Sequence, residues 1–138
     1  MMDQTTLLII KPDAVRNRKV GKIIQEIEDL GFEVVETSVY KFSRNSATRF
    51  YNEHLGKDFF QKHVDFISSG DCIALVISGE DVINRLRLLA GSTNPAEAEV
   101  GTLRQKYGTG LPENAVHTSD SEESFQREVE IIFPELYY

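Results

Sequence analysis

Two short apolar runs, at residues 7–10 and 72–77, are rich in β-branched side chains. Runs of this length are typical of strands buried on both faces, so we expect them at the centre of a sheet. Residues 32–42 form a third predicted strand, because alternate positions along this segment divide between two faces. The pattern therefore predicts at least three strands spread along the chain.

The segments between these strands repeat apolar side chains at helical spacing. Residues 20–30 place four apolar side chains on one face, and Gly31 supplies a stop for that helix. Asp120 and Glu123 form a capping-box-like pair that opens a predicted carboxyl-terminal helix. The other predicted helical segments are residues 43–54 and 59–67, which form a helical hairpin, 80–90, and a short amphipathic turn at 102–107.

The remaining segments are irregular or short. Residues 91–101 contain Gly, Ser, Asn and Pro without periodicity, which predicts a loop with a binding role. Residues 115–116 are a brief apolar pair. With 138 residues, against roughly 150 for an average domain, we expect one domain spanning 1–138. In this domain helices cover a small sheet of three or four strands.

Composition and charge exclude several classes of protein. The chain is 41% apolar and 27% charged, as in ordinary globular proteins, and its net charge of −7 argues against a protein that coats nucleic acid. The amino-terminal sequence has no secretory pattern, and no apolar run approaches the roughly 20 residues of a membrane span. A single cysteine, Cys72, cannot form an internal disulfide. We therefore expect a cytoplasmic protein that needs neither nucleic acid nor a membrane.

Among the three histidines, His117 is the candidate for chemistry. His54 and His63 lie on predicted helices, where surface or packing roles are the usual ones. His117 instead lies where a short apolar run gives way to a helix N-terminus, a place that favours anions. A neutral imidazole there has a lone pair for attack on phosphorus. The chain lacks G-x-x-x-x-G-K-[S/T], a kinase glycine loop and H-E-x-x-H, which argues against ATPase, protein-kinase and zinc-hydrolase templates.

Four motifs resemble the nucleoside diphosphate kinase family in order and spacing over nearly the whole chain. They are Leu-Leu-Ile-Ile-Lys-Pro-Asp-Ala-Val at 7–15, Thr-Asn-Pro-Ala at 93–96, Gly-Thr-Leu-Arg at 101–104, and Asn-Ala-Val-His-Thr-Ser-Asp-Ser at 114–121. The resemblance implies an α+β fold, a ferredoxin-like βαββαβ sandwich with a small antiparallel four-stranded sheet covered by helices. It also implies a homo-oligomer, a tetramer or hexamer built on a dimer.

The activity that the resemblance implies is a ping-pong transfer through a phosphohistidine on His117. The γ-phosphoryl group of a nucleoside triphosphate, typically ATP, would pass to a nucleoside diphosphate. Mg²⁺ would arrive with the nucleotide, with no metal ligand directly from the protein and Asp120 as a possible outer-sphere contact. Because every base has a π-face, stacking on Phe59 would give broad base specificity.

The resemblance also assigns roles to individual side chains. Lys11 and Asn114 are expected at the ribose hydroxyls, Tyr51 near the histidine, and Glu128, paired with Ser119, at the imidazole. Lys11, Arg87, Thr93 and Arg104 are expected at the phosphates. The implied catalytic set is His117, Lys11, Tyr51, Asn114, Ser119 and Glu128, and the implied nucleotide-binding set is Lys11, Phe59, Arg87, Thr93, Arg104 and Asn114.

Several positions depart from the family pattern. Thr118 replaces a glycine, and a β-branched residue there would cost on the order of 1–2 kcal/mol if φ were positive. His63 stands where many members place an apolar residue against the base, and Ala14, Asp71 and Ser92 also differ. These departures motivate an alternative, a catalytically weak member that acts as a nucleotide-binding or regulatory interaction module. A ferredoxin-like nucleic-acid binder is a third hypothesis, which the net charge disfavours.

Overall fold

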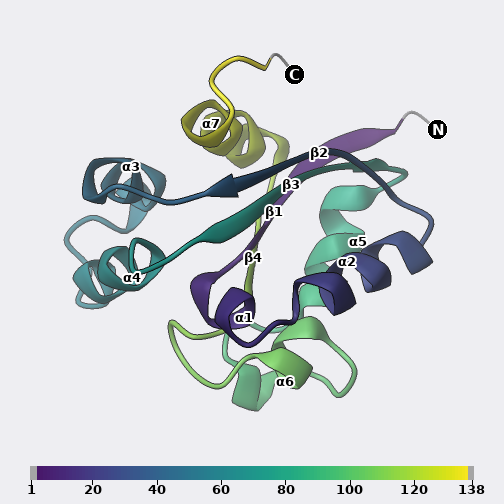
Figure 1. Ribbon diagram of the computed structural model, residues 1–138, viewed down its shortest axis with the longest axis horizontal. Coiled ribbons are helices and arrows are strands. Elements are labelled where there is room, and N and C mark those ends of the chain that lie inside the picture. The colour runs from purple at the N-terminus through teal and green to yellow at the C-terminus, as the bar shows by residue number, and fades with distance from the viewer. Residues whose placement is uncertain (1–2, 137–138) are drawn as a thin grey trace.

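Within residues 3–136, which the computed structural model describes, four strands form one antiparallel sheet in the order β2-β3-β1-β4. The strands are β1 (Gln4–Ile10), β2 (Glu33–Tyr40), β3 (Cys72–Gly79) and β4 (Val116–Thr118). The helices are α1 (Pro12–Arg16), α2 (Val20–Asp29), α3 (Arg44–Phe50), α4 (Phe60–Ile67), α5 (Val82–Ala90), α6 (Leu103–Tyr107) and α7 (Glu122–Ile132), with 3-10 turns at Asn52–His54 and Pro95–Glu97. The predicted α+β class and four-stranded antiparallel sheet are confirmed, and the α3–α4 hairpin lies between β2 and β3 within the βαββαβ order (Figure 1).

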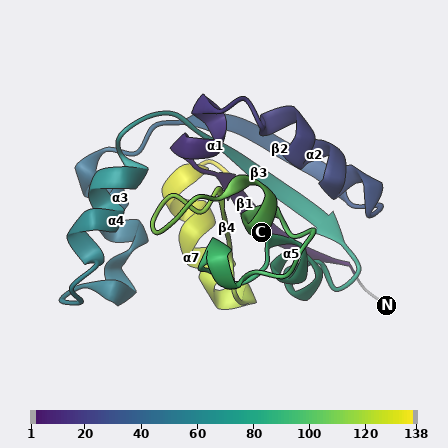
Figure 2. The same cartoon turned by 90° about the horizontal axis from the view of Figure 1, so that it is seen from below.

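The two apolar runs are the central strands, as predicted. Leu7 and Ile9 of β1 pack into a core shared with α3, α4 and α7, whereas Leu8 and Ile10 pack into a second core shared with α1, α2, α5 and α6. All four side chains are fully buried because helices cover both faces of the sheet. Strand β2 lies at the sheet edge. Figure 2 shows the α3–α4 hairpin at one end of the molecule, away from α2.

The structure also corrects some expected boundaries. Strand β2 covers residues 33–40 rather than 32–42, and the short helix α1 was not predicted. The predicted capping pair of Asp120 and Glu123 is wrong. The N-cap of α7 is Ser121, whose hydroxyl oxygen accepts from the backbone N–H of Ser124 at 3.0 Å.

Within the described part of the chain, no helix combines the length and apolar character needed to cross a bilayer.

Candidate functional site

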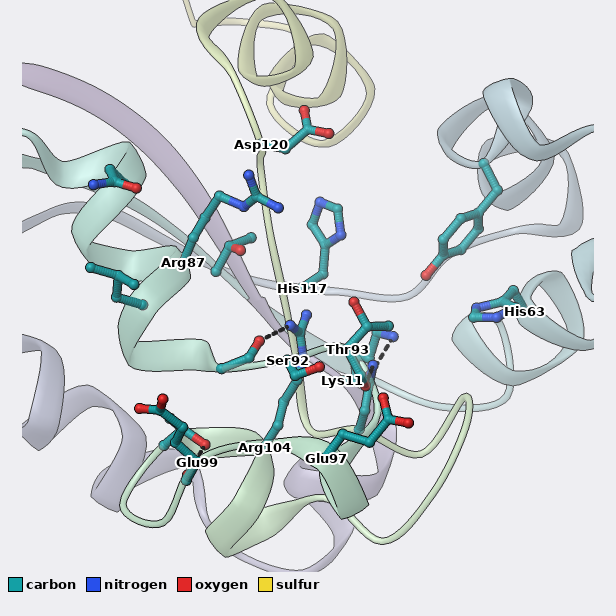
Figure 3. Close-up of a pocket in the computed structure, with 17 residues that line it drawn as sticks. Lys11, His63, Arg87, Ser92, Thr93, Glu97, Glu99, Arg104, His117 and Asp120 are labelled. Carbon is teal, nitrogen blue, oxygen red and sulfur yellow. Dashed lines mark hydrogen bonds between the residues drawn. The ribbon is translucent and has the colours of Figure 1, made fainter.

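A cavity of about 730 Å³ gathers most of the candidate site residues from distant parts of the sequence. Figure 3 shows Lys11, Arg87, Arg104 and His117 around it, with Asp120 above and His63 at one side. Of the predicted residues, those lining the cavity are Lys11, Tyr51, Arg87, Thr93, Arg104, Asn114, His117 and Asp120. Ser119 and Glu128 are buried behind His117, and Phe59 is not among the lining residues.

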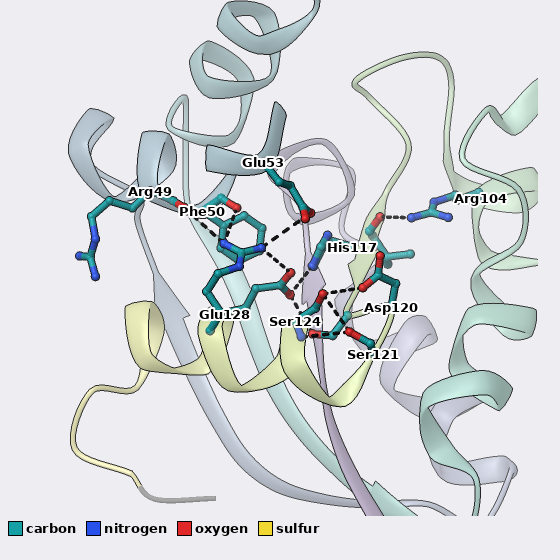
Figure 4. A network of polar contacts seen from close by, with 12 residues as sticks. Arg49, Phe50, Glu53, Arg104, His117, Asp120, Ser121, Ser124 and Glu128 are labelled. Carbon is teal, nitrogen blue, oxygen red and sulfur yellow. Dashed lines mark hydrogen bonds and ion pairs between the residues drawn. The ribbon is translucent and has the colours of Figure 1, made fainter. Parts of the chain in front are cut away.

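His117 is held by a buried carboxylate. It lies on β4 opposite Ile9 of β1, and its Nε2 is 2.7 Å from Oε1 of Glu128 on α7. The hydroxyl of Ser119 donates to the same carboxylate oxygen at 2.7 Å. Figure 4 shows His117 beside the Glu128 carboxylate. Since an ionised carboxylate only accepts hydrogen bonds, Nε2 donates the proton and Nδ1 keeps the lone pair. The imidazole is therefore oriented for attack through Nδ1.

The second oxygen of the Glu128 carboxylate lies close to Arg127, a residue that sequence reasoning missed. The guanidinium of Arg127 lies 3.4 Å from Oε2 of Glu128 and also donates to the backbone carbonyl of Phe50 at 3.1 Å. Burial alone would raise the pKa of Glu128, which is only 3% exposed, but His117, Ser119 and Arg127 together lower it. The carboxylate therefore stays ionised. The Phe50 ring, also missed, packs edge-on against His117 with centroids 4.8 Å apart.

A strained turn joins the cavity residues Asn114 and His117. Ala115 has a φ of +75°, and the N–H of Val116 donates to the carbonyl of Asn114 at 2.9 Å, which closes a γ-turn. A non-glycine residue in this conformation costs on the order of 1–3 kcal/mol, so the surroundings must hold it there. Thr118, in contrast, is part of β4, pairs with Leu8 and does not have a positive φ. The strain that a positive φ would cause at Thr118 is therefore absent, and the positive φ lies at Ala115 instead.

Lys11, Asn114 and Thr93 form a continuous chain of hydrogen bonds. The ammonium of Lys11 donates to Oδ1 of Asn114 at 2.8 Å, and Nδ2 of Asn114 donates to the carbonyl of Thr93 at 2.9 Å. Lys11 is buried, and burial together with the charge of Arg104 lowers its pKa from 10.5 to about 8. The structure thus brings together three residues that the sequence scatters over more than 100 positions.

The guanidinium of Arg104 is held in place by two backbone carbonyls. It donates to the carbonyl of Gly91 at 2.7 Å and to that of Val116 at 3.0 Å. Burial and the neighbouring charge of Arg87 lower its pKa to about 10, and it remains cationic at neutral pH. Arg104, Arg87 and Lys11 are three cationic side chains on a cavity wall that also carries the carboxylates of Glu97, Glu99 and Asp120. Such a site can hold an anionic ligand in a fixed orientation.

Aromatic rings lie at the His63 side of the cavity. The ring of His63 is 5.5 Å from that of Tyr51 and 5.2 Å from that of Phe59, which is 42% exposed. Burial and the charge of Lys11 lower the pKa of His63 to about 4, so it is neutral at pH 7. Phe60, the residue that follows Phe59 along the chain, packs against the core. Of the two helical histidines, His63 lines the cavity and His54 does not.

The acidic residues of the cavity do not form a metal cage. Among residues 3–136, no cluster of three His, Cys, Asp or Glu side chains could hold a metal ion. Asp120 is the cavity carboxylate nearest in sequence to His117, and a hydrogen bond from Ser124 lowers its pKa. Asp120 is therefore an ionised carboxylate on a wall that also carries Lys11, Arg87 and Arg104.

Comparison with known proteins assigns this chain to one family. The sequence model described as "Nucleoside diphosphate kinase" matches residues 4–137. A nucleoside diphosphate kinase of Methanocaldococcus jannaschii is 42% identical, with 97% of this chain and 96% of that protein aligned, and one of Persephonella marina is 44% identical over 99% and 97%.

Solved structures give the same result. The Aquifex aeolicus nucleoside diphosphate kinase superposes with a TM-score of 0.92 at 39% identity, covering 95% of each chain. A halophilic nucleoside diphosphate kinase from Halobacterium salinarum, in complex with CDP, gives a TM-score of 0.91 at 34% identity over 95% of this chain and 88% of that one.

Proposed function

Because this chain belongs to the nucleoside diphosphate kinase family, we propose that His117 is the residue phosphorylated in its reaction. The family transfers the terminal phosphoryl group of a nucleoside triphosphate to a nucleoside diphosphate in a ping-pong reaction through a phosphohistidine. One observation carries the assignment. His117 lies on the cavity wall with Nε2 bound to Glu128, which leaves Nδ1 as the nucleophilic nitrogen among three cations.

The two half-reactions use the same atoms in opposite directions. In the first, the Nδ1 lone pair attacks the γ-phosphorus, the bond to the β–γ bridging oxygen breaks, and the nucleoside diphosphate leaves with that electron pair. In the second, a terminal oxygen of another nucleoside diphosphate attacks the phosphorus and the N–P bond breaks. Glu128 stabilises the imidazole in both steps because its carboxylate accepts the hydrogen bond that Nε2–H donates throughout.

The cations supply the charge stabilisation that phosphoryl transfer requires. Arg104 is held by two backbone carbonyls, so little reorganisation is needed when charge develops on the transferring group. We assign Arg87, Arg104 and Thr93 to the phosphates, and Tyr51 to a position beside His117. This arrangement is supported by their common place on the cavity wall.

The nucleoside is assigned to the other side of the cavity. Lys11 and Asn114, joined by a hydrogen bond, would contact the ribose hydroxyls. Phe59, partly exposed and adjacent to the cavity residue His63, would stack on the base. Stacking without base-edge contacts would accept ATP and the other nucleoside tri- and diphosphates alike.

Kinases of this family generally need a divalent cation, and we propose that it is Mg²⁺. Mg²⁺ would neutralise phosphate charge when bound with the nucleotide, and Asp120 would contact its water shell. In an Asp120→Asn variant the Mg²⁺ concentration for half-maximal turnover should rise a few-fold. An unchanged Mg²⁺ requirement would contradict this role for Asp120.

We also propose that the protein is one domain and forms a homo-oligomer in the cytoplasm, a tetramer or hexamer built on a dimer. The dimer is supported by the exposed edge strand β2, where Val39 is 66% exposed. Val39→Lys should lower the mass measured by sedimentation velocity, and an unchanged mass would argue against a dimer across this edge. The cytoplasmic location is supported by the unpaired, buried Cys72.

The test of the catalytic assignment uses ATP labelled on its γ-phosphate. Wild-type protein with Mg²⁺ should acquire acid-labile, base-stable label that transfers to added GDP. His117→Ala should acquire none, whereas His54→Ala, outside the cavity, should label like wild type. Label that persists in His117→Ala would contradict the assignment. Nucleotide binding without any label would support the regulatory module instead.

A further inference from the structure

The γ-turn at Ala115 is held from both sides by residues of one short segment. The N–H of Ala115 donates to Oδ2 of Asp13 at 3.0 Å, and its carbonyl accepts from the backbone N–H of Lys11 at 2.8 Å. Asp13 belongs to α1, which directly follows β1, and the two contacts span more than 100 residues of sequence. Both polar backbone groups of the strained residue are thus bound by the segment that also carries Lys11.

This turn determines where two site residues lie. Asn114 precedes Ala115 and binds Lys11, and Val116 follows it, carrying His117 into β4. A relaxed conformation at Ala115 would redirect one flank relative to the other. The contacts to Asp13 and Lys11 therefore fix the position of the nucleophile relative to the predicted ribose-binding pair.

The carboxylate of Asp13 has a second, electrostatic effect. Burial and, to a lesser extent, Arg104 disfavour the charged form of Lys11, while Asp13, Cys72 and Glu113 favour it, and Asp13 is the strongest of these three. Burial raises the pKa of the Cys72 thiol to about 12, so the thiol is uncharged at neutral pH. Asp13 is therefore the principal negative charge acting on the Lys11 ammonium.

We propose that Asp13 is a positioning residue for phosphoryl transfer, whose carboxylate fixes the turn at Ala115 and supplies a negative charge beside the buried ammonium of Lys11. The inference rests on the proposed function, because it assigns roles to Lys11 and His117. The proposal also explains a buried carboxylate that the phosphoryl-transfer steps themselves do not use. Oδ1 of Asp13 is buried and has no hydrogen-bond partner among the described residues, a costly arrangement for a residue without a role.

Two substitutions separate the two effects. Asp13→Asn keeps an oxygen that accepts from Ala115 but removes the charge, whereas Asp13→Ala removes both. Asp29→Asn, at the exposed end of α2, is the matched control. The readouts are kcat and kcat/KM between pH 6 and 9, together with NMR titration of the Lys11 Cε signal in the nucleotide-free protein.

For Asp13→Asn we expect kcat at pH 6.5 within about twofold to threefold of wild type. The alkaline limb of kcat/KM and the Lys11 titration should both move to lower pH, by about one unit, because a favourable charge is lost. Asp13→Ala should lower kcat at least about tenfold at every pH. Asp29→Asn should match wild type in all three measurements.

Each part of the proposal has an outcome that overturns it. An unchanged Lys11 titration in Asp13→Asn would overturn the electrostatic role, and wild-type kcat in Asp13→Ala would overturn the positioning role. Equal loss of kcat in both variants would overturn the positioning role of the hydrogen bond between Asp13 and Ala115. The NMR titration needs no catalysis, so it tests Asp13 even if His117 acquires no label.

Discussion

The backbone of the 114–118 segment shows how the neighbours of one residue decide where strain lies. Thr118 differs from the family pattern at a position where glycine is usual, yet it pairs with Leu8 as an ordinary strand residue. Ala115 carries the positive φ and has no side chain that could stabilise it. The strained conformation is therefore stabilised by the hydrogen bonds of Asp13 and Lys11 to the Ala115 backbone, and not by the Ala115 side chain.

Replacing Thr118 with the glycine that is usual in the family should accordingly improve neither the stability nor the turnover of the protein. Glycine in a strand loses more conformational freedom on folding, so Thr118→Gly should lower the free energy of unfolding by about 0.5–1 kcal/mol and should not raise kcat. Urea unfolding and steady-state turnover measure the two effects. A gain in either quantity would show that threonine is strained at this position after all.

At the level of elements, α7 matters because it carries Glu128 and Arg127 to the back of His117. Ser121 caps the first turn of this helix, because its hydroxyl oxygen accepts a hydrogen bond from the backbone N–H of Ser124. The carboxylate of Asp120 accepts from the side-chain hydroxyl of Ser124. The helix start thus lies one residue later than the capping pattern of Asp120 and Glu123 predicts. This leaves Asp120 on the cavity wall rather than at the cap.

The effect of the cap can be measured directly. Ser121→Ala should lower the free energy of unfolding by about 1 kcal/mol, because it removes the acceptor for a backbone N–H at the helix start. Glu123→Ala, which removes the other member of the predicted pair, should change it by less than about 0.5 kcal/mol. Urea unfolding of both variants decides between the two assignments. The reverse order of effects would restore the predicted capping pair.

How far the sequence predicts the elements depends on their length. The strands at 7–10 and 72–77 and the longer helices carry clear periodicity, and the structure confirms them. Helix α1 and strand β4 have five and three residues, too few for a period, and both are held by contacts distant in sequence. Their existence could not be derived from local pattern alone.

The same distinction applies to the site. Motif resemblance identified eight of the residues that line the cavity, but it did not reveal the roles of Arg127, Phe50 and Asp13. These residues act on backbone groups or on other side chains across the fold, as Arg127 does on the carbonyl of Phe50. Such roles depend on the three-dimensional arrangement and leave no signal in a single sequence. The sequence alone does identify functional residues that lie close together in one motif, such as the motif from Asn114 to Ser121.

For the whole molecule, the site makes stability depend on pH. His63 is kept neutral by partial burial and by the charge of Lys11, and the pKa of Glu128 is lowered by its partners. Both groups bind a proton less readily in the folded than in the unfolded state. Stability should therefore fall as the pH decreases, because the unfolded chain takes up more protons. The functional cavity thus contributes to acid sensitivity.

His63 allows this contribution to be isolated. Its pKa falls from 6.5 in the unfolded chain to about 4 in the folded protein, so its unfavourable contribution grows as the pH drops through that window. His63→Leu and His63→Gln should both lose less stability than wild type between pH 7 and pH 4.5. The difference should be on the order of 1 kcal/mol, because solvent screens a half-buried ring. Urea unfolding at the two pH values measures it, and the glutamine variant controls for the added apolar surface. Parallel pH dependence in all three proteins would mean that His63 ionises in the folded state as it does in the unfolded chain. The acid sensitivity would then have to arise from Glu128 and the other carboxylates.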